Sequence, residues 1–307
     1  MDVPIRETFW QRVGPSRLAH ALARALPPVV AEGAIRAGAR AMVIAKPATY
    51  RQASDNLHHI LPQKTSEAAH KRALYRLFYN TVKDYYLFFR NLERRDNLAS
   101  LRPPVHMDHT VRLRIEEAAL SGRGLFFVAS HTSNFDLAGI GMTHYLPEPM
   151  QVLSIANPTS GYRYFNERRQ TDKGFVTPIT PASLRQAIER LRNGGIVMTS
   201  GDRPIPGGNQ PVTFFGHAAH LPTGYVRIPL ATNALVMTVA YHFDGTAYHV
   251  LGGPLMELDH TGVRAHDIRT NAQRILAELE PFIRRAPDQW RVFERVFDDP
   301  AEAECPS

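Results

Sequence analysis

The chain has 307 residues, enough for one large domain or two modest ones with a substantial hydrophobic core. Hydrophobic residues make up 44% of the sequence and charged residues 21%, which excludes intrinsically disordered, collagen-like and disulfide-scaffold proteins. The 36 Lys and Arg residues exceed the 29 Asp and Glu residues, and the formal net charge of +7 indicates anionic partners such as nucleic acid, anionic lipid or phosphorylated substrates.

The first part of the chain has a helical pattern. Residues 12–46 combine Ala, Val and Leu with arginines, and Pro27 and Pro28 interrupt the pattern, which predicts two helices with a bend between them. A long helix is predicted over residues 66–97, because apolar side chains recur there at helical spacing without Gly or Pro.

The helical N-terminal region, residues 1–100, is expected to contact the membrane interface. Phe9 and Trp10 can insert among lipid headgroups while the arginines that follow attract anionic lipid. The alternative is a helical hairpin packed on the rest of the protein. No segment offers the roughly 20 consecutive apolar residues of a membrane-spanning helix, so we expect this contact to be peripheral.

After Pro103 and Pro104, short apolar runs alternate with helical segments. Strands are predicted at residues 125–130, 151–156, 176–179, 196–200, 234–243 and 248–251, and helices at 110–121, from 134, at 162–171, 181–193 and 265–285. This alternation predicts an α/β fold with a central, mostly parallel or mixed sheet covered by helices. Residues 101–307 are expected to form this core as one structural unit, with its functional groups at the strand ends.

His131 is the main candidate for chemistry, because it directly follows the predicted strand at 125–130 and precedes Asp136 in the segment HTSNFD. If a helix starts at Asn134, itself a candidate substrate-binding residue, the Asp136 carboxylate can reach back to one imidazole nitrogen. The other nitrogen then takes a proton from a substrate hydroxyl, as a general base does. The alternative is purely structural, because this His and Asp spacing arises roughly once by chance at such a composition.

Four segments resemble, in the expected order, blocks of the lysophospholipid and glycolipid acyltransferase superfamily. They are most similar to the late acyltransferases of lipid A and the phosphatidylinositol mannoside acyltransferases. The four segments are RQASDNLHHILP at 51–62, VASHTSNFDLAG at 128–139, the run from GGIVMTSGDR to VMTVAY at 194–241, and APDQWRVFERVF at 286–297. Ser133 replaces a common Gly, Asp136 replaces the Glu typical of lipid A enzymes, and DLAG is closer to the glycolipid and phospholipid branch.

This resemblance implies further substrate contacts. It implies an arginine that contacts the acceptor headgroup or the acyl donor, and both Arg168 and Arg169 are candidates. Asp202 and Arg203 open a Gly- and Pro-rich loop after the strand at 196–200, where the family carries an acidic site residue. The alternatives are solvated helix arginines at 168 and 169 and a turn-forming aspartate at 202.

Two H-x2-H pairs raise the alternative of a metal hydrolase: His106 with His109, and His217 with His220. Zinc sites need three or four convergent ligands and the sequence has no H-E-x-x-H segment, so no metal site is expected. The second pair follows an F-F-G element and is compatible with a pocket wall. Its neighbours Phe214 and Phe215 are expected in the core.

The resemblance implies an acyltransferase that moves a fatty acyl group from an acyl thioester, acyl-CoA or acyl carrier protein, to a hydroxyl of a membrane glycolipid or lysophospholipid. No metal or redox cofactor is implied, because the thioester is a co-substrate. One alternative is an esterase or thioesterase that uses the same His131 and Asp136. Another is a basic polyanion-binding protein, although the chain has neither zinc-finger spacing nor an RNP1-like string, so nucleic acid is not an expected partner.

The single cysteine, Cys305, cannot form a disulfide within the chain, and the first 14 residues lack the pattern of a signal peptide. We therefore expect the protein at the cytoplasmic face of the cell membrane, bound peripherally to the anionic surface that holds its lipid acceptor. The sequence leaves the oligomeric state open.

Overall fold

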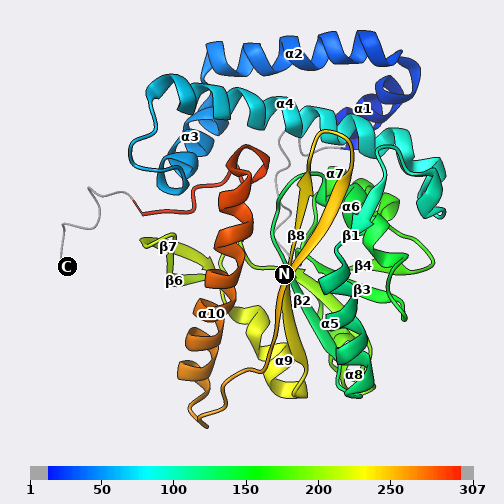
Figure 1. The fold of residues 1–307 in the computed structure, drawn as a ribbon, viewed down its shortest axis with the longest axis vertical. Coiled ribbons are helices and arrows are strands. Elements are labelled where there is room, and N and C mark those ends of the chain that lie inside the picture. Colours follow the sequence, from blue (N-terminus) through cyan, green and yellow to red (C-terminus); the bar gives the residue numbers. More distant parts are fainter. Residues whose placement is uncertain (1–12, 299–307) are drawn as a thin grey trace, which may run out of the picture.

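A seven-stranded sheet lies at the centre of the computed structural model, which describes residues 13–298 (Figure 1). The strand order is β1-β9-β8-β2-β5-β3-β4, and every neighbouring pair is parallel except β8 with β9. The strands are β1 (Val105–Met107), β2 (Leu125–Ala129), β3 (Met150–Ser154), β4 (Gly174–Pro178), β5 (Ile196–Ser200), β8 (Leu235–Phe243) and β9 (Tyr248–Met256). The predicted α/β fold with a mostly parallel sheet is confirmed.

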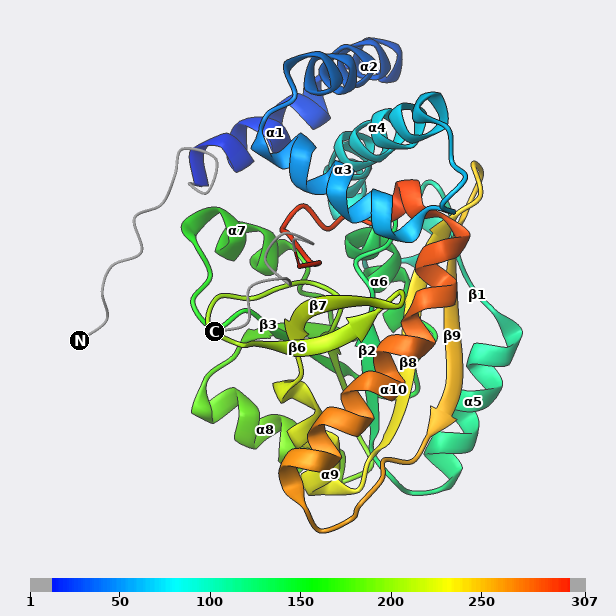
Figure 2. The same ribbon diagram turned by 90° about the vertical axis from the view of Figure 1, so that its left-hand side faces the viewer.

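Helices cover both faces of this sheet, as Figure 2 shows. Those that follow the first strand are α5 (His109–Leu120), α6 (Phe135–Thr143), α7 (Ser160–Arg168), α8 (Pro181–Arg192), α9 (Arg227–Thr232) and α10 (Arg264–Arg285). All five residues of β2, LFFVA, are buried, because successive side chains of a central strand point into opposite layers. Phe126 belongs to the core cluster shared with α8 and α10, and Phe127 to the cluster shared with α5 and α6.

Four helices of the described chain precede the sheet: α1 (Val13–Ala25), α2 (Pro28–Ala45), α3 (Ala48–Ile60) and α4 (Glu67–Asn91). Pro27 and Pro28 separate α1 from α2 as predicted, because proline fits the first turn of a helix but interrupts one that continues. The pattern did not predict α3. It also placed the end of α4 too late, because the Asn91 side chain accepts a hydrogen bond from the Arg102 amide and the chain turns there.

The N-terminal helices share a core with the sheet. Leu57 of α3 and Leu74 of α4 belong to the same hydrophobic cluster as Phe126 in β2. The outermost helix, α2, lies along α4 and turns Ile35 and Ala39 inward (Figure 1). None of the helices between residues 13 and 298 is long and apolar enough to cross a membrane. The predicted interfacial pair Phe9 and Trp10, and Cys305, lie outside the described residues.

An antiparallel hairpin, β6 (Asn209–Phe214) with β7 (His217–Pro222), occupies a stretch for which the sequence predicted no strands. Phe215 and Gly216 form its two-residue turn with φ angles of 52° and 80°, and a turn with both central φ angles positive matches the twist of the two strands. Phe214 and Phe215 are both buried, so their expected place in the core is confirmed. The hairpin escaped prediction because the exposed sides of both strands carry mostly small and polar residues.

Candidate active site

His131 and Asp202 lie side by side because the two strands that precede them are neighbours. The parallel register of β2 and β5 pairs Ala129 with Ser200. His131 and Asp202 each lie two residues after this pair. The carboxyl ends of parallel strands meet at one edge of a sheet, which is where functional groups gather in such folds. His131 is 8% exposed and Asp202 is fully buried, so the pair stands at the border between the interior and the site.

Both oxygens of the Asp202 carboxylate form hydrogen bonds with neighbouring residues. Its Oδ1 lies 2.6 Å from Nδ1 of His131, while Oδ2 accepts hydrogen bonds from the His131 backbone amide at 2.7 Å and from the Trp290 indole N–H at 2.8 Å. Burial alone would raise the pKa of Asp202, but the His131 charge and these hydrogen bonds outweigh it and hold the pKa below its ordinary value. A carboxylate only accepts hydrogen bonds, so in the neutral imidazole Nδ1 carries the proton. Nε2 is then free to take a proton from a substrate.

The closing segment of the chain holds the His131 loop in place. The Ser133 amide donates to the Gln289 carbonyl at 2.7 Å, and the Arg291 amide donates to the His131 carbonyl at 2.8 Å. Between them Trp290 forms an antiparallel bridge with the residue before Ser133. The indole of Trp290 is 1% exposed, so both its backbone and its side chain fix the histidine and its carboxylate partner.

The expected contact between Asp136 and the His131 imidazole is wrong for this structure. Asp136 lies on the first turn of α6 as predicted, but its Oδ1 accepts from Nε of Arg169 at 2.7 Å and lies 2.6 Å from Nη2 of the same side chain. Ser133 turns the chain with a φ of +52°, the left-handed region that favours Gly, and Nδ1 of the imidazole is already taken by Asp202. The sequence therefore identified a carboxylate of the site but paired it with His131, whereas its partner in the structure is Arg169.

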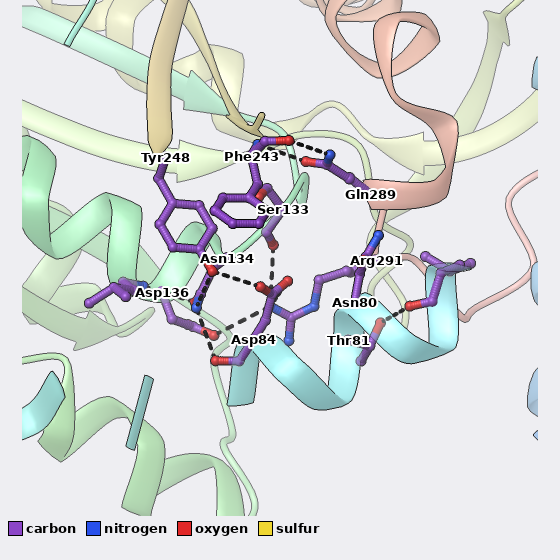
Figure 3. A network of polar contacts seen from close by, with 12 residues as sticks. Asn80, Thr81, Asp84, Ser133, Asn134, Asp136, Phe243, Tyr248, Gln289 and Arg291 are labelled. Carbon is purple, nitrogen blue, oxygen red and sulfur yellow. Dashed lines mark hydrogen bonds and ion pairs between the residues drawn. The ribbon is translucent and has the colours of Figure 1, made fainter. Parts of the chain in front are cut away.

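A buried ionic network connects Asp136 with Arg291 and Asp84 (Figure 3). Arg291 lies 3.7 Å from the Asp84 carboxylate and 4.0 Å from that of Asp136, and donates to the Ser133 carbonyl at 3.2 Å. Asp84 also accepts a hydrogen bond from the Tyr248 hydroxyl at 3.0 Å. Burial raises the pKa of Asp84 to about 7 even though Arg291 opposes the shift.

Asn134 has a structural role in this fold, and its substrate contact stays a prediction. Its side-chain oxygen accepts from the Leu137 amide and caps α6, and its amide group donates to the Asp84 carbonyl at 2.9 Å. The residue is fully buried. An asparagine at a helix start is a capping signal in any sequence, so this role was recognisable before the fold was known.

A cavity of about 110 Å³ opens beside the pair of His131 and Asp202. One part of its wall is polar and includes His131, Asp136, Tyr162 and Arg169. The rest is mostly apolar and lies among the strand ends and α6, where the lining residues include Ile140, Met150, Val152, Val176, Met198 and Tyr241. The cavity therefore joins a proton acceptor and a cation to a wall that suits an aliphatic chain.

The two candidate arginines at the end of α7 have separate surroundings. Arg169 lines this cavity, and although burial would lower its pKa, the Asp136 carboxylate raises it overall. Arg168 lines a different hollow and packs its guanidinium on the Tyr164 ring, 3.2 Å from the ring centre. The pair of neighbouring arginines is therefore divided between two sites.

Tyr162 is a member of the site that sequence reasoning missed. Burial opposes its ionisation, but Arg169 and Arg203 lower its pKa overall. Arg203 in turn has its pKa raised by Tyr162 and Glu294 against the effect of burial, with Glu294 at 4.0 Å. Arg203 therefore lies in the polar cluster beside the cavity, next to the Asp202 that precedes it. A tyrosine in a predicted helix gave no signal of this role.

The four histidines of the H-x2-H pairs are distributed over separate surroundings. The ring of His106 on β1 lies tilted beside that of His249, with 5.9 Å between ring centres, and His109 begins α5. In the hairpin, His217 lies 4.7 Å from the His59 ring, and His220 lies 2.7 Å from the Asp298 carboxylate. Neither pair lines the cavity beside His131, so the predicted place of the second pair in the pocket wall is wrong.

Comparisons with known proteins identify the family of the chain. A family model described as bacterial lipid A biosynthesis acyltransferase matches residues 16–298. The chain is similar to the phosphatidylinositol mannoside acyltransferase of Mycolicibacterium smegmatis, with 24% identity over 276 residues, 89% of this chain and 87% of the relative. A second similar protein is the phosphatidylinositol mannoside acyltransferase of Mycobacterium tuberculosis, with 21% identity over 183 residues, 59% of this chain and 56% of the relative.

Proposed function

The chain belongs to the bacterial lipid A biosynthesis acyltransferase family, and from this membership we propose that it transfers a fatty acyl group from an acyl thioester to a hydroxyl of a membrane glycolipid. Acyl-CoA and acyl carrier protein are the two candidate donors. The observation that carries the proposed mechanism is the contact of 2.6 Å between Asp202 and His131, which lines a cavity with a mostly apolar wall. A lysophospholipid is the alternative acceptor.

In this mechanism His131 is the general base. Its Nε2 takes the proton of the acceptor hydroxyl while the hydroxyl oxygen attacks the thioester carbonyl. The Asp202 carboxylate balances the positive charge that forms on the imidazole and holds the ring in place. When the tetrahedral intermediate collapses, the carbon–sulfur bond breaks and the imidazolium returns the proton to the leaving thiolate. No acyl-enzyme forms, and the chain's own residues supply every proton transfer.

Arg169 is proposed to act on the charged parts of the substrates. Asp136 holds its guanidinium at the polar end of the cavity, beside Tyr162. A guanidinium there can bind a phosphate of the acceptor or stabilise the negative oxygen of the intermediate. Arg203 lies in the same polar cluster and serves the same end. Asp136 is thus a positioning residue for Arg169 in this proposal.

The first acceptor to test is a mannosylated phosphatidylinositol, because two similar proteins carry the name phosphatidylinositol mannoside acyltransferase. Such a lipid offers hydroxyl groups for His131 and a phosphate for an arginine. Because the identities are 24% and 21%, experiment must determine which sugar is acylated and how long the acyl chain is.

The outer face of α2 is proposed as the membrane contact of residues 1–100, with residues 101–307 as the catalytic unit. Five of its exposed apolar residues recur every three or four positions and form one stripe, which we call the outer stripe: Val30, Ala34, Ala37, Ala41 and Ile44. Val30 is 54% exposed and Ile44 is 81% exposed. Exposed arginines on the same helix can attract anionic lipid at the cytoplasmic face of the membrane.

The experiment that tests this function incubates the purified protein with radiolabelled palmitoyl-CoA, or palmitoyl acyl carrier protein, and vesicles that contain the mannosylated lipid. Label in the lipid acceptor supports acyl transfer. Label released only as free fatty acid, in the presence of acceptor, supports the hydrolase alternative instead. The His131→Ala variant should lose transfer by a factor of roughly 100 to 10,000 while it still binds vesicles.

A further inference from the structure

A second hollow of about 690 Å³ lies between α1, the end of α4 and α7, away from the cavity at His131. In Figure 2, α1 lies above α7, and the strands of the sheet lie to the right of α7. The charged side chains that line the hollow are mainly basic: Arg24, Arg90, Arg94, Arg95 and Arg168, with Glu93 and Glu167. It is larger than the cavity at His131, and the mechanism proposed above uses none of its residues.

The positive charge of this hollow is only partly neutralised from within. Glu93 pairs with Arg24 at 2.7 Å, and Glu167 lies 3.6 Å from Arg168. Arg90 and Arg94 make no ion pair with any carboxylate of residues 13–298, and both are exposed. A concave surface with an excess of one charge concentrates ligands of the opposite charge.

Two of these arginines are fixed before any ligand arrives. The Arg168 guanidinium lies on the Tyr164 ring and donates to the Tyr164 carbonyl at 3.1 Å. Arg95 donates from Nη1 to the Arg168 carbonyl at 3.2 Å, and its Nε lies 4.0 Å from the Asp96 carboxylate but makes no hydrogen bond in the described chain. A buried donor without a hydrogen bond is uncommon, so this N–H can still bind an acceptor.

Two of the residues that line the hollow, His20 and Phe89, are aromatic and carry no charge. The His20 ring stacks on Phe89 with 4.9 Å between ring centres, and its Nδ1 lies 2.8 Å from the Tyr164 hydroxyl. Burial lowers the pKa of His20, as do the charges of Arg168 and Arg24, so this ring stays neutral at neutral pH. A lining that combines these neutral rings with several guanidinium groups suits an organic phosphate and opposes a metal cation.

We propose that this hollow binds the phosphate groups of a substrate of the acyl transfer reaction. Guanidinium groups hold phosphate through paired, charge-assisted hydrogen bonds, and Arg90, Arg94 and Arg95 have donors to spare. Two sources offer that chemistry: the nucleotide end of a coenzyme A thioester, and the phosphate of an anionic lipid in the membrane. The choice of these two sources rests on the proposed function. The phosphate site itself rests only on the arginines that line the hollow.

Binding of the two ligands by the whole protein tests this inference without any turnover. The hollow variant is Arg90→Gln/Arg94→Gln, which removes two exposed charges. The matched control is Arg185→Gln/Arg192→Gln, which removes two exposed charges from α8 at the far end of the molecule (Figure 1). The probes are coenzyme A, by calorimetry, and vesicles of phosphatidylcholine with phosphatidylinositol, by sedimentation at low salt.

We expect the hollow variant, and not the control, to bind one of the probes at least tenfold more weakly than the wild type. Weaker binding of coenzyme A assigns the hollow to the donor, and weaker binding of the vesicles assigns it to lipid phosphate. Equal binding by wild type and hollow variant, or equal losses in the hollow and control variants, overturns the inference. A protein that binds phosphate here but transfers no acyl group would contradict the proposed function and leave this site standing.

Discussion

His131 and Asp202 are 71 residues apart in the sequence, yet the Asp202 carboxylate binds both the ring and the backbone amide of His131. Each residue lies two positions beyond the end of its strand, and the parallel register of β2 with β5 brings them together. The contact is therefore a property of the sheet itself. This explains why the carboxylate partner of the histidine comes from the end of the neighbouring strand β5 and not from the nearby Asp136.

Replacing Trp290 by Phe should weaken catalysis through Asp202. The change keeps an aromatic ring in the core but removes the indole N–H that donates to Asp202 at 2.8 Å. With one hydrogen bond fewer, the pKa of Asp202 rises, and hydrogen bonds to a charged group contribute about 1.5–3 kcal/mol. We expect transfer to fall roughly tenfold or more and the acid limb of the pH–rate profile to move to higher pH. A profile identical to that of the wild type would rule out this role.

Replacing Asp136 by Asn should destabilise the fold. The variant leaves the buried Arg169 and Arg291 without the carboxylate between them. Removing one partner of a buried ion pair typically costs about 3–5 kcal/mol. Urea unfolding of wild type and variant at one pH measures this loss. An unchanged free energy of unfolding would show that Asp136 does not hold the two arginines.

Asp84 should make the folded protein less stable as pH rises. Burial raises the pKa of Asp84 to about 7 in the folded state, against about 4 in the unfolded chain. Between these values the folded protein holds a proton that unfolding releases, so the free energy of unfolding falls as pH rises from 4 to 7. Asp84→Asn removes this titration. The variant should therefore be more stable relative to the wild type at pH 8 than at pH 5, and an equal difference at both pH values would contradict the shift.

The outer stripe of α2 should control vesicle binding. Val30→Ser/Ile44→Ser removes its two largest apolar side chains, which are exposed, so folding is expected to be unchanged. The matched control is Leu113→Ser/Leu120→Ser on α5, where the two leucines are 50% and 89% exposed. Sedimentation with anionic vesicles should show weaker binding for the α2 variant alone, since each buried methylene contributes about 0.8 kcal/mol. Equal binding by both variants would place the membrane contact elsewhere.

The features of the sequence that are local predicted the fold well. Apolar runs such as LFFVA and helical spacing such as that of α4 are visible within ten to twenty residues, so most strands and helices were found. The hairpin β6 with β7 was missed because Pro211 and small residues hide its alternation.

The pairing of the site residues depends on strand order, which a single sequence does not contain. His131 and Asp202 were each identified at the end of a predicted strand, but nothing in the sequence says that β2 and β5 are neighbours. For the same reason the contribution of Trp290 could not be foreseen, because it comes from the far end of the chain. Asp136 is closer to His131 in the sequence than Asp202 is, but in the structure it contacts Arg169 instead.

The most direct test of this account is the rate of acyl transfer by Asp202→Asn, measured in a single turnover with labelled donor and glycolipid acceptor in vesicles. The asparagine keeps the shape of the side chain but removes its charge, so the imidazole loses both its charge partner and its preferred tautomer. We predict a fall of roughly 100 to 10,000-fold, with vesicle binding and thermal unfolding close to those of the wild type. Transfer at the rate of the wild type would contradict the claim that His131 and Asp202 act together as the base.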